Sequence, residues 1–414
     1  MSRKSSSKGT GAKLRRAAAG AVRKKAGSEV RKNARKVFRK IPLKILIPAA
    51  AAVFGILAGV TFVPEEQVPR ALEKPHTALL TARNKLIRMS GLPISRYDDT
   101  FILPNDGSAP IRLYFAPSPK ICPAVCAFIR SAVRSVDVCA FDIKLDAVAD
   151  ALIDAKARGI DVRVVTDTDY LKNPALCRLS RAGIPIVSDR KSSLMHNKFI
   201  VVDSRFVWTG SYNLTDNGTE RNDNNALLIE SPSIAKGYEE RFKQYWNGKF
   251  STEGKRSAPQ TNVFIGRIPA QYAFSPTDKI CDILMHELSG AKHTVDVMAF
   301  SFTGAELAGK LRELVKRGVR VRCLFDYGQS KNKASRDGYL RKIGAQVYYS
   351  PNRTGKMHHK VFIIDEKTVI TGSYNFSRNA EKRNDENILL IRSPRLAELY
   401  TREMDRCIKG VKGY

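Results

Sequence analysis

A polar motif that occurs twice with one spacing constrains this chain more than any other feature of its sequence. In each copy a histidine, a lysine two residues later, an apolar run and an aspartate precede Gly-Ser-Tyr-Asn. The copies start at His196 and His358, and their separation is unchanged at Asn213 and Asn375 (358 minus 196 equals 375 minus 213). A lone histidine on an apolar strand is usually a core residue, but two copies that match at every polar position indicate two halves of one site.

The residues around each motif predict a hairpin of buried strands. Side chains alternate between the faces of a strand, so each histidine shares a face with the lysine two residues later. The apolar runs 199–202 and 361–364 are then buried, and the polar triplets after them are turns that lead to return strands over 206–209 and 368–371. Each return strand ends at Gly-Ser, where a small residue lets the backbone approach a ligand.

These residue types fit chemistry at a phosphodiester. A neutral imidazole can attack phosphorus and form a phosphohistidine, while a second, protonated imidazole donates a proton to the leaving oxygen. Lysine supplies a positive charge, and asparagine and serine supply neutral donors, for the phosphoryl oxygens. This chemistry needs neither a metal nor a cofactor, and we expect none. His358 and His359 are adjacent on a strand and point to opposite faces, so we expect no joint metal site there.

The motif resembles the HKD motif of the phospholipase D superfamily, whose members cleave or transfer phosphodiesters with two facing motifs. The sequence after the second motif is similar to the nuclease-like branch, the small bacterial endonucleases and the mitochondrial membrane-anchored member. There a glutamate at the position of Glu386 contacts a catalytic histidine, whereas the first half has Asn224. The resemblance implies these catalytic residues: His196, Lys198, Asp203, Ser211, Asn213, His358, Lys360, Asp365, Ser373, Asn375 and Glu386.

The two histidines are therefore not expected to be equivalent. A carboxylate stabilises an imidazolium, whereas a neutral amide only orients the ring. We expect the histidine that contacts Glu386 to be the nucleophile, and the crossed arrangement of some relatives favours His196.

The repeat extends beyond the motifs and predicts the fold. Phe115 to Cys122 matches Phe274 to Cys281, and segments near 136–163 match segments near 295–322, at a slightly shorter spacing than the motifs (274 minus 115). Strands that alternate with helices, with Gly159 and Gly318 ending a helix before a buried strand, indicate an α/β/α layered domain. We predict a tandem duplication with pseudo-two-fold symmetry: a first half over 111–247, a linker over 248–269 and a second half over 270–410. Both half-sites lie in one chain, which favours a monomer.

The residues before the repeat predict an arm, an anchor and a stalk. Residues 1–44 hold 16 Lys and Arg and one acid, typical of a disordered basic arm. Residues 45–63 form 19 uncharged positions, enough for a single transmembrane helix of about 28 Å. A buried core helix and a cleaved signal peptide are the alternatives. Residues 64–110 are the expected stalk.

The positive-inside rule puts the basic arm in the cytoplasm and the catalytic region across the membrane. The Arg- and Ser-rich start also fits a mitochondrial targeting segment, so the membrane itself stays open.

Charge points to a polyanionic partner. The formal net charge is +31, and removing the +15 of the arm (16 minus 1) leaves +16 on residues 45–414. Such an excess attracts nucleic acid or an anionic membrane, although it can also serve solubility. Seven cysteines are too few for a disulfide scaffold. The basic residues nearest the motifs, expected at the pocket mouth, are Arg221, Arg353, Lys356 and Arg383.

Three functions follow in order of preference. The first is a phosphodiesterase acting on nucleic acid, DNA or RNA. The second is a phospholipase D or phosphatidyltransferase, which the anchor favours because it places the site beside lipid. The third is a non-catalytic tether for nucleic acid or phospholipid, against which the two intact motifs argue.

Overall fold

The computed structural model describes residues 101–102, 111–254 and 263–410. The predicted arm, transmembrane helix and nearly all of the stalk lie outside these residues. Within the described ranges, no helix is both long and apolar enough to cross a membrane.

The first half is an eight-stranded mixed sheet with the order β1-β2-β8-β7-β6-β3-β4-β5. The parallel strands β3, β4 and β5 are joined by helical crossovers, and β6, β7 and β8 run antiparallel to their neighbours. The elements are β1 (Phe101–Ile102), β2 (Ile111–Ala116), α4 (Ile121–Arg130), β3 (Ser135–Ala140), α5 (Asp146–Ala157), β4 (Asp161–Thr166), η3 (Thr168–Tyr170), α6 (Pro174–Arg181), β5 (Ile186–Ser188), β6 (Lys198–Val202), β7 (Phe206–Gly210), α7 (Asp216–Glu220), β8 (Asn224–Glu230), α8 (Pro232–Trp246) and η4 (Ser251–Glu253).

The second half repeats this topology. Its sheet order, β9-β10-β16-β15-β14-β11-β12-β13 when written from the same side, matches the first strand for strand. The elements are β9 (Val263–Ile265), β10 (Ile268–Ser275), α9 (Ile280–Ser289), β11 (Thr294–Ala299), α10 (Ala305–Lys316), β12 (Arg320–Phe325), α11 (Tyr327–Ser330), α12 (Asp337–Lys342), β13 (Gln346–Tyr349), β14 (Lys360–Ile364), β15 (Thr368–Gly372), α13 (Arg378–Lys382), β16 (Glu386–Arg392) and α14 (Pro394–Lys409).

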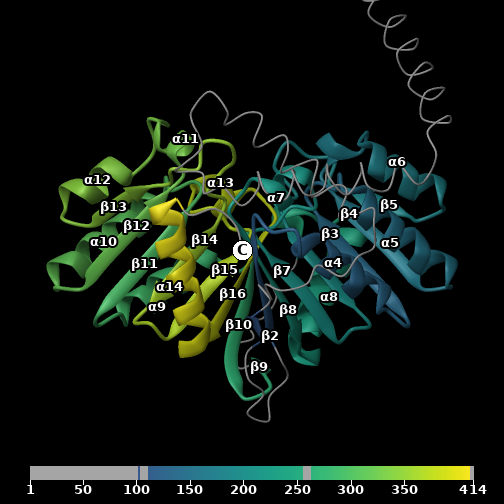
Figure 1. The fold of residues 1–414 in the computed structure, drawn as a ribbon, viewed down its shortest axis with the longest axis horizontal. Helices are drawn as coiled ribbons and strands as arrows, with labels where there is room; N and C mark the ends of the chain where they lie inside the picture. Colours follow the sequence, from purple (N-terminus) through teal and green to yellow (C-terminus); the bar gives the residue numbers. More distant parts are fainter. Residues whose placement is uncertain (1–100, 103–110, 255–262, 411–414) are drawn as a thin grey trace, which may run out of the picture. The chain divides into compact units, whose positions relative to one another are not determined.

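The predicted duplication of an α/β unit is thus confirmed, and Figure 1 shows the two halves with their sheets adjoining. The helix-ending glycines are also confirmed: α5 and α10 stop two residues before Gly159 and Gly318, both at φ +82°. One boundary is corrected. β9 and the start of β10 lie inside the predicted linker 248–269, so the second sheet begins at Val263.

The described residues form three apolar cores, one within each half and one shared by both. One lies under α4, α5 and α6, on the outer side of the first sheet, and its counterpart lies under α9, α10 and α12 of the second. The third core is shared by both halves and takes side chains from α8, α14 and the inner faces of both sheets. Phe199 of the first half packs 6.3 Å from Phe274 of the second, and Phe115 packs 5.3 Å from Tyr400, measured between ring centroids. Because this core spans both sheets, the two motifs are held in fixed positions relative to each other.

The motif strands β6 and β14 are buried along their whole length, because helices cover one face and the shared core covers the other. The predicted hairpin turns are present, with Asp203, Ser204, Asp365 and Glu366 all at φ between 50° and 55°. Each turn brings its return strand back beside the motif strand.

Candidate active site

His196 lies just before β6, at the junction of the two halves. Its backbone N–H donates to the carbonyl oxygen of Asp385 at 2.9 Å. Its Nδ1 lies 2.7 Å from Oε2 of Glu386, the first residue of β16, and both side chains are buried. The crossed contact between His196 and Glu386, which the sequence favoured, is therefore present.

His358 occupies the equivalent place before β14 and faces a neutral partner. Its Nδ1 lies 2.8 Å from Oδ1 of Asn224. The amide nitrogen of Asn224 donates to the carbonyl oxygen of Gly218 at 3.1 Å, which fixes the amide so that its oxygen faces the ring. Nδ1 of His358 must then carry a hydrogen, and Nε2 is the atom left for chemistry.

The lysines of the two motifs have matching environments. Nζ of Lys198 donates to the carbonyl oxygen of His196 at 2.6 Å, and Nζ of Lys360 donates to that of His358 at 2.7 Å. A phenylalanine ring lies about 5 Å from each Nζ and also packs against the histidine of the same half, with centroids 4.8 and 4.9 Å apart. These rings, Phe141 and Phe300, were not predicted as site residues, although the repeat contains both.

Burial sets the protonation of these groups. Desolvation lowers the pKa of His196 to about 4, against the opposing effect of Glu386, and lowers the pKa of Lys198 to about 7. Burial, followed by the charges of Lys360, Lys198 and His196, holds the pKa of His358 well below its ordinary value. Burial likewise lowers the pKa of Lys360. Because groups from one half affect those of the other, the four side chains belong to one electrostatic site.

The two asparagines of the motifs have unused bonding capacity. The Oδ1 atoms of Asn213 and Asn375 are buried and lack a hydrogen-bond partner among the described residues. Asn213 lines a small cavity together with Lys198 and Phe141. Buried amides normally have all their bonds made, so this arrangement is typical of groups that bind a ligand.

The serines hold the neighbouring strand instead of projecting a free hydroxyl. Ser211 Oγ donates to Oδ1 of Asn224 at 3.1 Å and accepts the N–H of Asn225 at 3.0 Å. Ser373 Oγ accepts the N–H of Asn387 at 3.0 Å. The structure thus gives Ser211 a positioning role beside His358, in place of the predicted contact with phosphoryl oxygens.

The aspartates of the two motifs lie at the other end of the motif strands from the histidines, so their predicted catalytic role rests on the resemblance and not on contact with the histidines. Asp203 follows the far end of β6, and its carboxylate accepts the backbone N–H groups of Val133, Arg134 and Ser135 at 2.7 to 3.0 Å. Asp365 does the same for Lys292, His293 and Thr294 at 2.7 to 2.9 Å. A five-residue strand separates each aspartate from its histidine, a span of about 16 Å.

Comparison with known proteins identifies this arrangement. The family described as "Cardiolipin synthase, PLD-like domain" matches residues 125–246 and 284–408, one match in each half. The chain belongs to this phospholipase D-like family. The superfamily predicted from the two motifs is therefore confirmed.

The relatives carry lipid names. "Mitochondrial cardiolipin hydrolase" of Xenopus tropicalis is 37% identical over 115 residues, 27% of this chain and 55% of that protein. "Phospholipase D" of Rickettsia conorii is 34% identical over 138 residues, 33% of this chain and 68% of that protein. The chain spans about half the length of the cardiolipin hydrolases that it matches.

Among solved structures, phosphatidylserine synthase of Haemophilus influenzae Rd KW20 aligns with 80% of this chain and 91% of its own. The TM-score is 0.57 and the identity 14%, a likeness of fold alone.

A second layer of polar residues connects the two phospholipase D-like halves behind the histidines. Nδ2 of Asn387 donates to Oδ1 of Asn197 at 2.8 Å. At the equivalent place in the other half, Nδ2 of Asn225 lies 3.0 Å from Nδ1 of His359. These contacts join residues that are far apart in the sequence, so motif spacing alone did not predict them.

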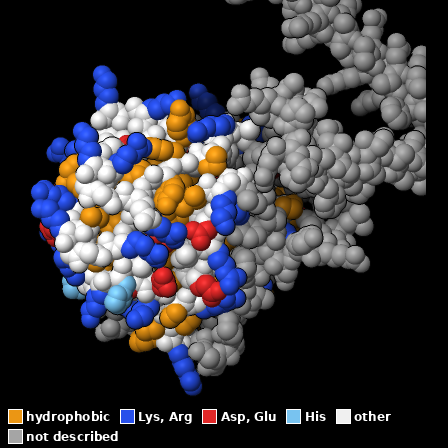
Figure 2. All heavy atoms as spheres, turned by 60° about the vertical axis from the view of Figure 1, so that its left-hand side comes forward, with side chains coloured by type: hydrophobic (Ala, Val, Ile, Leu, Met, Phe, Trp, Pro, Cys, Tyr) orange, Lys and Arg blue, Asp and Glu red, His pale blue; other side chains and the backbone are white. Residues whose placement is uncertain are grey.

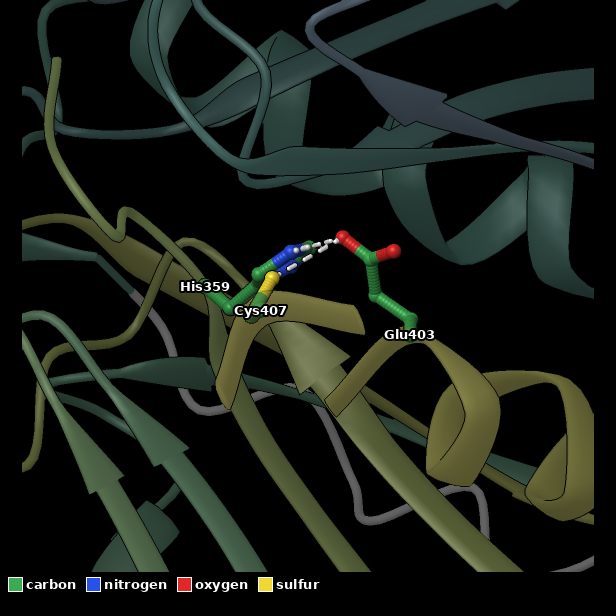
Figure 3. Close-up of side chains that lie close together, drawn as sticks. All are labelled: His359, Glu403 and Cys407. Carbon is green, nitrogen blue, oxygen red and sulfur yellow. Dashed lines mark hydrogen bonds and ion pairs between the residues drawn. The ribbon is translucent and has the colours of Figure 1, made fainter. Parts of the chain in front are cut away.

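The described residues contain one group of possible metal ligands, His359, Glu403 and Cys407 (Figure 3). Nε2 of His359 lies 2.9 Å from Oε1 of Glu403, and Cys407 Sγ lies 3.4 Å from the same oxygen. Arg406 donates to both carboxylate oxygens at 2.8 Å. Burial raises the pKa of Glu403, but the charge of Arg406 outweighs burial, and the pKa falls to about 2. A guanidinium already neutralises this carboxylate, so the group fits a buried ion network and not a cation site.

Proposed function

We propose that this protein is a phosphodiesterase that works through a phosphohistidine on His196 and that its substrate is nucleic acid. The observation that carries the assignment is the unequal pairing of the two histidines: His196 with the carboxylate of Glu386 at 2.7 Å, and His358 with the amide of Asn224 at 2.8 Å.

The first step forms a covalent intermediate. The Nδ1–H group of His196 donates a hydrogen bond to Glu386. The lone pair of Nε2 is therefore free to attack phosphorus. As the P–N bond forms, the bond to the leaving oxygen breaks, and that oxygen takes the proton from Nε2 of His358. Glu386 stabilises the imidazolium character of the phosphorylated ring, which Asn224 cannot do for His358.

The second step reverses these roles. His358, now neutral, accepts a proton from a water molecule as the water oxygen attacks phosphorus. The P–N bond then breaks and returns the electron pair to His196. Lys198, Lys360 and the Nδ2 groups of Asn213 and Asn375 are the donors that we assign to the non-bridging oxygens in both steps.

The anionic substrate supplies the charge that this site lacks. Burial disfavours the protonated forms of His358 and both lysines in the free protein. A phosphodiester anion among them favours these same forms, because an opposite charge within a few Å raises a pKa. Binding of the substrate therefore raises the pKa of His358 and favours the protonated form that acts as the general acid.

Nucleic acid is favoured as substrate by the charge of the chain, +31 in all and +16 on residues 45–414. The second candidate is a phospholipid, and the observation in its favour is the names of the relatives, cardiolipin hydrolase and phospholipase D.

We also propose that residues 45–63 anchor the protein in a membrane, mitochondrial or other, through one helix, with the basic arm on the cytoplasmic side.

The deciding experiment compares His196→Ala, His358→Ala and the unchanged protein on a small chromogenic phosphodiester with EDTA present. We expect the turnover of each variant to fall by about 10²- to 10⁴-fold. Quenching in denaturing alkali, under which the P–N bond of a phosphohistidine survives, should place the phosphoryl group on His196. Full activity in either variant, or a phosphoryl group found equally on both histidines, would contradict the mechanism. Parallel assays with single-stranded DNA, RNA and cardiolipin vesicles separate the two substrate candidates.

A further inference from the structure

The loops that lead into the two motifs have different chemistry. The segments 188–195 and 350–357 align without a gap at the spacing of the two motifs. At matching positions the first has Lys191 and Leu194, and the second has Arg353 and Lys356. Two residues after β4 and β12 end, Thr168 corresponds to Tyr327, because the repeat spacing there is shorter than at the motifs (327 minus 168). The pseudo-two-fold symmetry of the fold is therefore broken beside the site.

In the second half these residues form an exposed basic and aromatic surface. The guanidinium carbon of Arg353 lies 3.6 Å from the ring centroid of Tyr327, and Nζ of Lys331 lies 4.4 Å from the same centroid. Arg353 also donates to the carbonyl oxygen of Ser350 at 3.0 Å. Tyr327 is 39% exposed, so the stacked pair faces solvent. Figure 2 shows the second-half side of the molecule, where Lys and Arg side chains are more numerous than acidic ones.

Lys191, at the position that matches Arg353, already has partners within the first half. Its Nζ donates to the carbonyl oxygen of Phe250 at 3.1 Å and pairs with Glu253 at 2.6 Å. At this one position the positive charge is thus paired in the first half and presented to solvent in the second, and the first loop also has the exposed Arg190.

Lys356 connects this surface to the catalytic groups. Its Nζ lies 5.4 Å from the ring centroid of Phe300, the ring that packs against His358. Burial is the largest cause of the lowered pKa of His358 and of Lys360, and the charge of Lys356 lowers both further. The loop that leads into the second motif thus has Lys356 beside the catalytic groups and Arg353 three residues earlier in the chain.

The loop that carries these cations is fixed by the other half. A Cβ on Gly355 would lie 1.9 Å from the backbone oxygen of Arg221, so only glycine fits this close approach. Nδ2 of Asn352 donates to the same oxygen at 2.8 Å, and the N–H of Lys356 donates to Oδ1 of Asn222 at 3.0 Å. Such anchoring lowers the entropy lost when a ligand binds.

We infer that Tyr327, Arg353 and Lys356 form a subsite for single-stranded polynucleotide on the leaving-group side of the scissile phosphate. This rests on the proposed function, in which His358 protonates the leaving oxygen. The leaving part of the substrate then lies on the side of His358, which is also the side of Lys356. Lysine and arginine neutralise phosphates, and the guanidinium plane of Arg353, backed by the Tyr327 ring, offers a stacking surface for a base. A lipid arm has no ring to stack on this surface.

The test uses Arg353→Ala and Tyr327→Thr, the latter introducing the residue of the first half, with Lys191→Ala as the matched control. The first two variants should raise the Kd of a fluorescent oligothymidylate by about 5- to 100-fold in anisotropy titrations, and the control should not. All three variants and their reference carry His196→Ala in this titration, so binding is measured without turnover, and the subsite can fail while the chemistry stands, and the reverse.

Orientation is tested with two trinucleotide substrates. In one the trinucleotide is the leaving group; in the other 4-nitrophenol leaves and the trinucleotide stays on the phosphorus. The Arg353 and Tyr327 variants should raise KM by about 5-fold or more for the first substrate relative to the second. An equal effect on both substrates, an unchanged Kd for oligothymidylate, or a defect seen only with cardiolipin vesicles would overturn the inference.

Discussion

At the residue scale, one hydrogen-bond partner distinguishes the two catalytic histidines. His196 has the carboxylate of Glu386 and His358 has the amide of Asn224, whereas the positive charges of both lysines act on both rings. The first environment favours a nucleophile that becomes positively charged, and the second favours an acid that gives up its proton readily. The difference of one side chain is enough to assign the two roles.

This assignment predicts an acidic pH optimum. Activity requires neutral His196, whose pKa is about 4, and protonated His358, whose pKa lies well below the ordinary 6.5. The kcat/KM profile of the free enzyme should therefore already be falling at pH 6.5, because the pKa of His358 lies below that pH. Asn224→Glu, which gives His358 the partner that His196 has, should move the falling limb up by about 1–3 pH units.

The control is Glu386→Gln, which should lower turnover and leave the falling limb in place. An alkaline optimum in the unchanged protein, or an Asn224→Glu profile that coincides with it, would show that His358 is not the acid.

Much of this site could be predicted from the sequence because the duplication marks its members. Two histidines, two lysines and two asparagines recur at one spacing, and the structure brings all six side chains to the junction of the halves. Asp203 and Asp365 recur as faithfully but serve structure, because repetition marks a shared fold as well as a shared site. Contacts such as Asn197 with Asn387 could not be predicted, since they depend on how two distant strands face each other.

At the element scale, the turn after each motif strand is held by its aspartate. Asp203→Ala removes the acceptor of three backbone N–H groups, from Val133 to Ser135, and should lower the free energy of unfolding by about 1–3 kcal/mol. Because the carboxylate lies at the far end of β6, kcat of the folded variant should stay within about twofold of the original. Denaturant unfolding and active-site-normalised kinetics measure the two effects. A large fall in kcat with intact stability would restore Asp203 to the catalytic residues.

The end of each return strand requires a glycine. Gly372 has φ +154°, and a Cβ there would lie 2.2 Å from the backbone oxygen of Asn387. Gly372→Ala should therefore lower the free energy of unfolding by about 2–4 kcal/mol. Gly309 lies in α10, and a Cβ added there would meet nothing within 4 Å, so Gly309→Ala should instead stabilise the protein by about 0.5–1 kcal/mol. Equal effects in denaturant unfolding would contradict the role of the close approach.

Three strands, β8, β16 and β9, were harder to predict than the motif hairpins. β8 and β16 begin at polar residues, Asn224-Asn225 and Glu386-Asn387, which are typical of loops although their backbones pair in the middle of the sheet. These polar side chains are buried because they form the site and the bonds between the halves. β9 escaped prediction because it is a three-residue edge strand in a polar, Gly-containing stretch.

At the scale of the whole molecule, one chain contains both halves of the site, and a core that spans both sheets keeps them together. Each histidine also has its backbone N–H bound by the other half, at Asp385 and Asp223. Separating the halves would expose this core and leave those groups unpaired, so exchange of a half between two chains is disfavoured. We therefore propose that the catalytic unit is a monomer.

Complementation tests this proposal. His196→Ala and His358→Ala proteins, purified separately and mixed at equal concentration, should remain as inactive as each alone, because neither molecule can supply its partner with the missing half-site. If the active unit were a dimer that exchanges halves, a substantial share of the mixed molecules would regain an intact site after co-refolding. Turnover of a small chromogenic phosphodiester before and after co-refolding measures this, with the unchanged protein refolded alone as the control. Recovered activity would show that the site assembles between chains and would replace the monomer with an exchanged dimer.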